Sequence, residues 1–173
     1  RRLSQLGREV AFVFPEATVV RGSVIEPIFV GSEAGMQAWA QMPPAQYDEF
    51  RFMLPVQKGR YRMQVTLGFN LYHGILSFRL NDEEIGRIDA FSVVSRIQRV
   101  LLDFEVPSSS DAHILTGSTL EKNPDSLEYW QCLVSAVVVP VRADDGPMND
   151  EITEVAAGMW TPRQLALREW LRE

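Results

Sequence analysis

Aromatic, amide and imidazole side chains recur between the apolar runs of this chain, and they are its best candidates for binding chemistry. The segment from Asn70 to His73 offers all three kinds of group. Aromatic rings offer apolar faces on which a ligand can stack, while amides and imidazoles can hydrogen-bond to its polar groups. The candidate ligand-binding residues are Trp39, Tyr47, Tyr72, His73, Asn123 and Tyr129.

Each candidate also has a structural interpretation. Tyr72 and His73 could pack their loop against the edge of a sheet. Trp39 and Tyr47 could line a cleft or plug the open end of the fold, and the sequence favours neither alternative. Asn123 stands directly before a proline, which is typical of a turn.

Catalytic chemistry finds little support in the residues. The chain has two histidines, His73 and His113, and one cysteine, Cys132, with no nucleophile-elbow sequence beside them. Acidic residues that could pair as acid and base are Glu49, Asp89, Asp103 and Glu105, but the sequence does not place two of them at a catalytic separation. We therefore expect a protein that is not an enzyme.

Composition argues against several other classes of protein and site. The formal net charge of -6 argues against nucleic-acid binding, which concentrates Lys and Arg on one surface. The longest apolar stretches are shorter than the ~20 residues of a membrane-spanning helix. One cysteine and two distant histidines do not make a structural zinc site.

Short alternating runs predict β-structure through residues 1–145. Regular strands separated by turn residues favour a sandwich or barrel over βαβ units. The clearest alternation lies at 61–67, and Pro55 is expected to end the strand at 50–54. A hairpin turn is expected at 81–84, and the remaining strands are expected at 10–14, 25–30, 97–104, 113–119 and 129–141.

Residues 146–173 read as a helical tail or a linker to a following domain. Thr161, Pro162 and Gln164 resemble a helix start, with an N-cap, a first-turn proline and a capping box. The apolar residues Leu167, Trp170 and Leu171 would then share one face. Such a helix would dock on the sandwich or lead into the next domain.

Four stretches in the β region resemble modules of the galactose-binding-like superfamily, especially carbohydrate-binding modules of families 6 and 35 attached to bacterial glycoside hydrolases. The stretches are 47–62, 74–89, 111–115 and 121–129, and together they cover roughly residues 45 to 141. The chain departs from the family pattern at Glu121, and at Ser110 or Asp111, where glycines are usual.

The resemblance implies an antiparallel β-sandwich of the jelly-roll kind acting as a non-catalytic accessory module. It would hold a glycan by aromatic stacking and loop hydrogen bonds, in a secreted or cell-surface protein. The resemblance also allows for calcium, with Glu9, Glu16 and Asp89 as candidate ligands. The main alternative is a structural or protein-interaction sandwich that packs against a neighbouring domain or protomer. A trimeric jelly roll of the tumour-necrosis-factor-like kind is a more distant alternative, based on Gly59, Arg60 and Tyr61.

Overall fold

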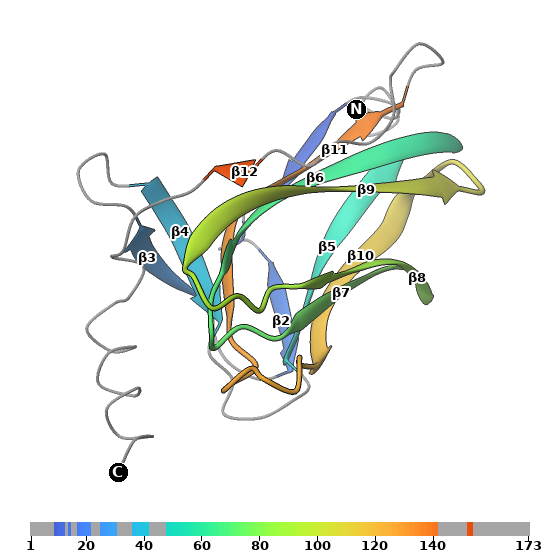
Figure 1. The fold of residues 1–173 in the computed structure, drawn as a ribbon. Coiled ribbons are helices and arrows are strands. Elements are labelled where there is room, and N and C mark those ends of the chain that lie inside the picture. Colours follow the sequence, from blue (N-terminus) through green and yellow to red (C-terminus); the bar gives the residue numbers. More distant parts are fainter. Residues whose placement is uncertain are drawn as a thin grey trace.

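Two antiparallel β-sheets face each other in the computed structural model of the chain (Figure 1). The structure describes residues 9–12, 14, 17–21, 25–30, 36–41, 48–141 and 152–153. Every strand pairing within these residues is antiparallel. The predicted all-β sandwich is therefore confirmed.

The larger sheet has seven strands within the described residues, and its path runs β12-β9-β6-β11-β4-β3, with β1 also paired to β11. Their bounds are β1 Val10–Phe12, β3 Glu26–Val30, β4 Met36–Gln41, β6 Gly59–Phe69, β9 Arg96–Val106, β11 Gln131–Pro140 and β12 Ile152–Thr153. The smaller sheet has the order β2-β5-β10-β7-β8. Its strands are β2 Thr18–Arg21, β5 Asp48–Val56, β7 Ile75–Leu80, β8 Glu83–Asp89 and β10 Ser110–Glu121.

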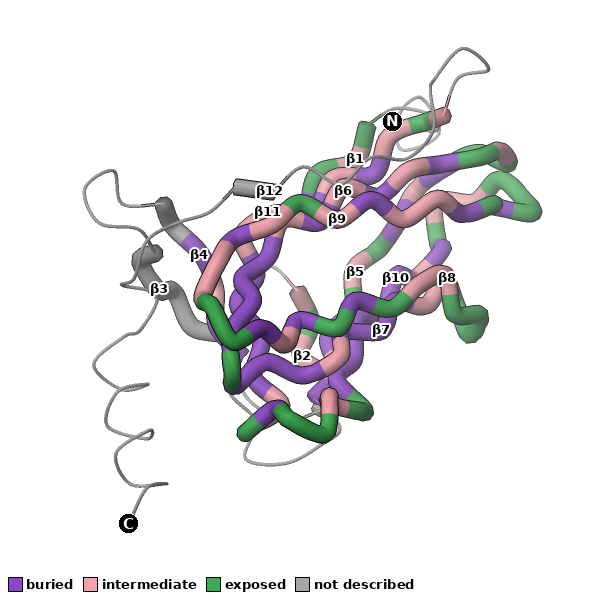
Figure 2. The backbone as a smooth tube through the Cα atoms, viewed as in Figure 1, coloured by how far each residue is buried: buried purple, intermediate pink, exposed green. Residues whose placement is uncertain are grey.

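Apolar side chains at alternate positions form the core between the sheets. In β6 the buried series is Tyr61, Met63, Val65 and Leu67, as the sequence predicts. Opposite them lie the buried side chains of the smaller sheet, including Phe50, Leu76, Phe78 and Leu115. Figure 2 shows this burial concentrated on the central strands of both sheets.

The prediction that Pro55 ends its strand is wrong, because β5 continues through Pro55 to Val56. The pairing of β5 with β10 is irregular at this point: the register shifts between Ser110 and His113, opposite Val56 and Leu54. A bulge leaves a ladder position unpaired, so a proline, which has no N–H to donate, is tolerated there.

The predicted hairpin between β7 and β8 is confirmed, with its turn at Asn81 and Asp82. Asn81 has a φ of 54°, in the left-handed region that asparagine tolerates better than most residues. Its side-chain Oδ1 accepts a hydrogen bond from the backbone N–H of Ile114, at 3.0 Å. The turn is thereby fixed against β10.

Part of the predicted tail region belongs to the larger sheet, since Ile152–Thr153 forms β12 and pairs with β9. The helix start predicted at Thr161 and the apolar face from Leu167 to Leu171 lie outside the described residues. Within the described residues there is no helix long and apolar enough to cross a membrane.

Candidate functional site

The outer face of the smaller sheet carries two rows of polar side chains. Successive residues of a strand point to opposite faces, and Leu115 lies in the core, so Thr116 and Ser118 of β10 face outward. The register then aligns Arg51, Thr116 and Arg79 across β5, β10 and β7. The next row aligns Glu49, Ser118 and Ser77 across the same strands.

The arginines of this face differ in how far they are paired. Arg79 donates from Nη2 to Oε2 of Glu49 at 3.1 Å, whereas its Nε is buried without a hydrogen-bond partner in the described structure. Arg51 is exposed, and its guanidinium has no hydrogen-bond or ion-pair partner among the described residues. Two incompletely paired guanidinium groups therefore flank the hydroxyl of Thr116.

These side chains surround a pocket of about 340 Å³ on the outer face. It is lined by Glu49, Arg51, Arg79, Asn81, Asp82, Ile114 and Thr116. The amide of Asn81 is already engaged, because its Nδ2 donates to Nδ1 of His113 at 3.1 Å. The groups left for a ligand are donors at the arginines, acceptors at Asp82 and at the second carboxylate oxygen of Glu49, the hydroxyl of Thr116 and the apolar side chain of Ile114.

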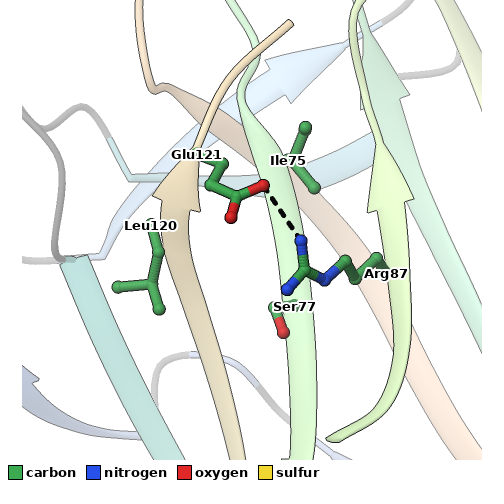
Figure 3. A pocket seen from close by; sticks show the side chains of 5 residues that line it. All are labelled: Ile75, Ser77, Arg87, Leu120 and Glu121. Carbon is green, nitrogen blue, oxygen red and sulfur yellow. Dashed lines mark hydrogen bonds and ion pairs between the residues drawn. The ribbon is translucent and has the colours of Figure 1, made fainter.

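A smaller hollow of about 20 Å³ lies further along the same face and is lined by Ile75, Ser77, Arg87, Leu120 and Glu121 (Figure 3). Here Arg87 donates to Glu84 at 2.5 Å and to Glu121 at 2.9 Å. Glu84 also accepts from Ser77, and that hydrogen bond is the main cause of the lowered pKa of its carboxyl group. Arg87 is thus compensated by two carboxylates, unlike Arg51.

Two of the predicted ligand-binding residues, Tyr72 and His73, are buried in the loop between β6 and β7. The Tyr72 ring is 5% exposed and stacks on Trp130, with ring centroids 5.1 Å apart. Nδ1 of His73 lies 2.6 Å from the backbone oxygen of Gly68, and burial lowers the pKa of His73 to about 4. A neutral Nδ1–H donating to that oxygen fits both facts, so these residues pack their loop onto the sandwich.

Two other predicted residues, Asn123 and Tyr129, lie together in the loop between β10 and β11. Asn123 donates from Nδ2 to Oδ2 of Asp89 at 2.9 Å and accepts from the backbone N–H of Asp125 at 3.0 Å. The ring of Tyr129 is half-buried, and the ammonium of Lys122 lies 5.3 Å from its centroid. Since Asp89 pairs with Ile75 on β7, this loop borders the end of the outer face beyond the smaller hollow.

The last two predicted residues are not brought to this loop. Trp39 lies on β4 in the larger sheet, where it is partly buried and packs against the core, 6.2 Å from the ring of Phe14. Tyr47 lies outside the described residues.

Sequence reasoning missed Arg51, Arg79 and Thr116 as a group. Their outward orientation follows from strand alternation, because their neighbours Phe50, Leu115 and Phe78 point into the core. Their proximity depends on the strand order β5-β10-β7, which joins residues far apart in the chain. The sequence therefore shows that these polar residues face outward. It does not show that they lie together, because it does not specify which strands pair.

The described residues contain no group of three or more His, Cys, Asp or Glu side chains that could hold a metal ion. Both carboxylate oxygens of Asp89 already accept hydrogen bonds, from Asn123 and from the backbone N–H of Phe91. Glu9 is exposed, and Glu16 lies outside the described residues. These residues do not assemble a calcium site in the part that the structure describes.

Comparison with known proteins gives no match to any family model and none to any curated protein. Solved structures do match. A xanthan lyase from Paenibacillus aligns with a TM-score of 0.54 at 18% identity over 75% of this chain, which spans only 14% of that lyase. A family 35 carbohydrate-binding module from Clostridium thermocellum aligns with a TM-score of 0.52 at 7% identity, over 77% of this chain and 98% of that one.

The C-terminal family 6 carbohydrate-binding module of LamC, a laminarinase from Zobellia galactanivorans, aligns with a TM-score of 0.52 at 8% identity. The alignment covers 76% of this chain and 99% of that module. Identities this low establish the fold alone. The chain has the β-sandwich fold of carbohydrate-binding modules of families 6 and 35, as the sequence resemblance implies.

Proposed function

We propose that the chain is a non-catalytic carbohydrate-binding module and that its glycan lies on the outer face of the smaller sheet. The observation that carries this proposal is the polar pocket of about 340 Å³ between Arg51 and Asp82. The fold that the chain shares with carbohydrate-binding modules supports it.

The chemistry of the pocket suits a sugar. Sugar hydroxyl groups both donate and accept hydrogen bonds, so they are best satisfied where donors and acceptors alternate. Arg51 supplies donors, Asp82 supplies acceptors, and the hydroxyl of Thr116 can do either. Ile114 offers an apolar surface to the carbon-bound hydrogens of a sugar ring.

Tyr129 gives the same face an aromatic neighbour at its far end. The Tyr129 residue is partly exposed, and the Asn123–Asp89 hydrogen bond holds the surrounding loop. We therefore include stacking on Tyr129 in the proposal, with Asn123 as a polar contact. The proposal treats Tyr72 and His73 as supports of the neighbouring loop.

The one cysteine and the two histidines are poorly placed to act as a nucleophile or as general bases, which favours binding without catalysis. Burial raises the pKa of the Cys132 thiol to about 12, so the nucleophilic thiolate is not populated at neutral pH. His73 is buried, and both ring nitrogens of His113 lie within hydrogen-bond distance of other groups. A general base would need a free nitrogen facing the ligand.

A glycan array probed with the purified chain tests the proposal. We expect binding to a defined group of glycans, and a loss of about ten-fold or more in affinity for Arg51→Gln, because hydrogen bonds to charged groups are strong. Thr116→Val should weaken binding within the pocket, and Tyr129→Ala should weaken it at the loop end of the face. Lys58→Gln is the matched control, since it removes one positive charge at the exposed turn between β5 and β6.

Absence of binding across the array, or equal binding by Arg51→Gln and Lys58→Gln, would refute this site. Circular dichroism of each variant establishes that it is folded, so that a lost signal reports on binding.

A second candidate function, a protein-interaction module, is favoured by apolar residues at the loop end. Val93 is 77% exposed and Leu127 is 56% exposed. The loops that carry them are joined through the loop between β6 and β7, by hydrogen bonds from the Leu127 N–H to Leu71 and from the Ser92 N–H to Asn70. Exposed aliphatic clusters often mark protein contacts. Self-association or partner binding that is lost in Val93→Asp, in a chain that binds no glycan, would support this function instead.

A further inference from the structure

The outer face of the larger sheet carries a second apolar cluster, separate from the core. Its buried members are Ala38 and Ala40 of β4, Ile97 of β9 and Cys132 of β11, each no more than 2% exposed. Strand alternation turns the β4 and β11 members outward, because their neighbours Trp39 and Leu133 pack in the core. Ile97 faces the same way, since it pairs with Gly68, the residue after the buried Leu67 of β6. The cluster therefore crosses β9, β6, β11 and β4 on the side away from the core.

The burial of this cluster points to a further layer of chain. The outer face of an antiparallel sheet is usually solvated unless another segment covers it. These side chains are buried within a single chain, and burial raises the pKa of the Cys132 thiol to about 12. Among the described hydrophobic residues, Val134 alone packs against the cluster, and it lies on β11 itself. A segment of this same chain from outside the described residues is therefore needed as the cover.

We propose that residues 155–160, which follow β12, cover the cluster as a third layer. β12 lies at the edge of the larger sheet beside β9, and its last residue, Thr153, pairs with Ile97 itself (Figure 1). The chain thus leaves the sheet at one end of the cluster. Four adjacent strands at a spacing of roughly 5 Å give the cluster a width of about 15 Å, which about five extended residues can cross.

The residues of this segment match the surface that they cover. The sequence at 155–160 is Val-Ala-Ala-Gly-Met-Trp, without a charge. The cluster is made mostly of small side chains, and Gly68 between Ile97 and Cys132 has none. Such a shallow face admits large side chains, and Met159 and Trp160 supply them, so that apolar area is buried on both sides.

Two other segments outside the described residues fit this surface less well. Residues 143–151 carry the four acidic side chains Asp144, Asp145, Asp150 and Glu151, which lose hydration against an apolar face. Residues 1–8 precede β1, where Val10 pairs with Val138. Val138 lies about 20 Å along β11 from Cys132, so that segment starts at the wrong end of the strand.

Alkylation of Cys132 by iodoacetamide in the full folded chain tests the proposal, because Cys132 is the one cysteine of the sequence and belongs to the cluster. We expect slow labelling of the wild type. Labelling of Trp160→Ala should be about ten-fold faster or more at the same pH, because loss of a large apolar contact lets the segment detach. Trp170→Ala is the matched control, which removes the same kind of side chain further along the chain and should keep the wild-type rate.

Two further measurements separate detachment of the segment from unfolding of the sandwich. Circular dichroism establishes that each variant is folded, and Met159→Ala replaces Trp160→Ala if that variant is not. Local detachment exposes little surface, so the faster rate should hardly change with low concentrations of urea. A rate that rises steeply with urea would report global unfolding and would overturn the proposal.

The remaining outcomes are equally decisive. Equal rates in the wild type and both tryptophan variants would overturn the assignment to residues 155–160. Wild-type labelling as fast as that of the urea-unfolded chain would show that the cluster is uncovered. A wild-type rate that rises on dilution would identify a second copy of the chain as the cover. None of these results depends on glycan binding, which is proposed for the other sheet.

Discussion

Gly117 of β10 lies directly beneath the ring of Phe50, which leaves no room for a side chain. A Cβ at this position would come within 3.0 Å of three ring carbons of Phe50. Phe50 is 1% exposed, and its neighbours along β5 are Glu49 and Arg51. The packing of Phe50 on the inner face therefore helps to hold Glu49 and Arg51, which line the pocket, in position.

Gly117→Ala should destabilise the fold by about 1–3 kcal/mol, because a buried aromatic ring must move to admit the methyl group. Urea unfolding measures the change in the free energy of unfolding. Gly86→Ala is the matched control: the three atoms nearest to its Cβ belong to the branched end of the half-buried Leu102 side chain, so an aliphatic side-chain end, and not a buried aromatic ring, must move. Equal losses in the two variants would contradict this account of Gly117.

His73 makes stability depend on pH. Burial lowers its pKa from the ordinary value of 6.5 to about 4 in the folded state. Between these two values the unfolded chain binds a proton that the folded chain does not, so the free energy of unfolding falls as pH decreases from 6.5 toward 4. The full contribution, roughly 3 kcal/mol, is present above pH 6.5.

His73→Asn should flatten this dependence, because an amide can donate to the backbone oxygen of Gly68 and does not titrate. Denaturant unfolding at several pH values between 4 and 6.5, in wild type and variant, measures the difference in slope. Subtracting the two curves removes the contributions of carboxylates common to both. Parallel curves would show that His73 is not the group responsible.

At the scale of elements, β6 and β9 form the longest regular pairing of the larger sheet, running without a shift from Gly59 to Phe69. Arg62 and Asp103 lie directly opposite each other in this pairing and make two hydrogen bonds, of 2.6 and 2.9 Å. The hydrogen bond from Arg62 is the main reason why the pKa of Asp103 is lowered. The pair therefore helps to hold the register of two central strands.

Asp103→Asn should lower the free energy of unfolding by about 1 kcal/mol at neutral pH, because a cross-strand ion pair between partly buried groups contributes about that much. The contribution is complete above the ordinary pKa of 3.8 and is lost as pH falls through the lowered value in the folded state. Thermal or urea unfolding should thus show a difference in stability between wild type and variant at neutral pH, and this difference should disappear at strongly acidic pH. A stability difference that does not change with pH would point to altered packing.

The strands with strong alternation, such as β6 and the β7–β8 hairpin, could be predicted because their signal is local. The short strands β2, β4 and β12 could not, since only their sheet partners hold them in place. The candidate site shows the same division. The loop containing Tyr129 is visible in the sequence, whereas the row Arg51, Thr116 and Arg79 depends on the register of three strands. Tyr72 is an aromatic loop residue in the sequence, and only packing on Trp130 reveals its burial.

At the scale of the whole molecule, the outer face of the smaller sheet brings the polar side chains of several strands together. β5, β10 and β7 are adjacent in the smaller sheet, and their outward side chains are the polar rows that form the pocket. The loop with Asn123 and Tyr129 borders one end of this face, and the turn at Asn81 and Asp82 borders the other (Figure 1). We therefore expect one binding surface that extends along these strands.

Titration of the ¹⁵N-labelled chain with the oligosaccharide that binds most tightly on the array, followed through backbone amide shifts, tests this claim most directly. We expect the largest chemical-shift changes at Arg51, Thr116 and Arg79, with smaller changes near Tyr129. Changes confined to the larger sheet, or no changes with any glycan of the array, would contradict it.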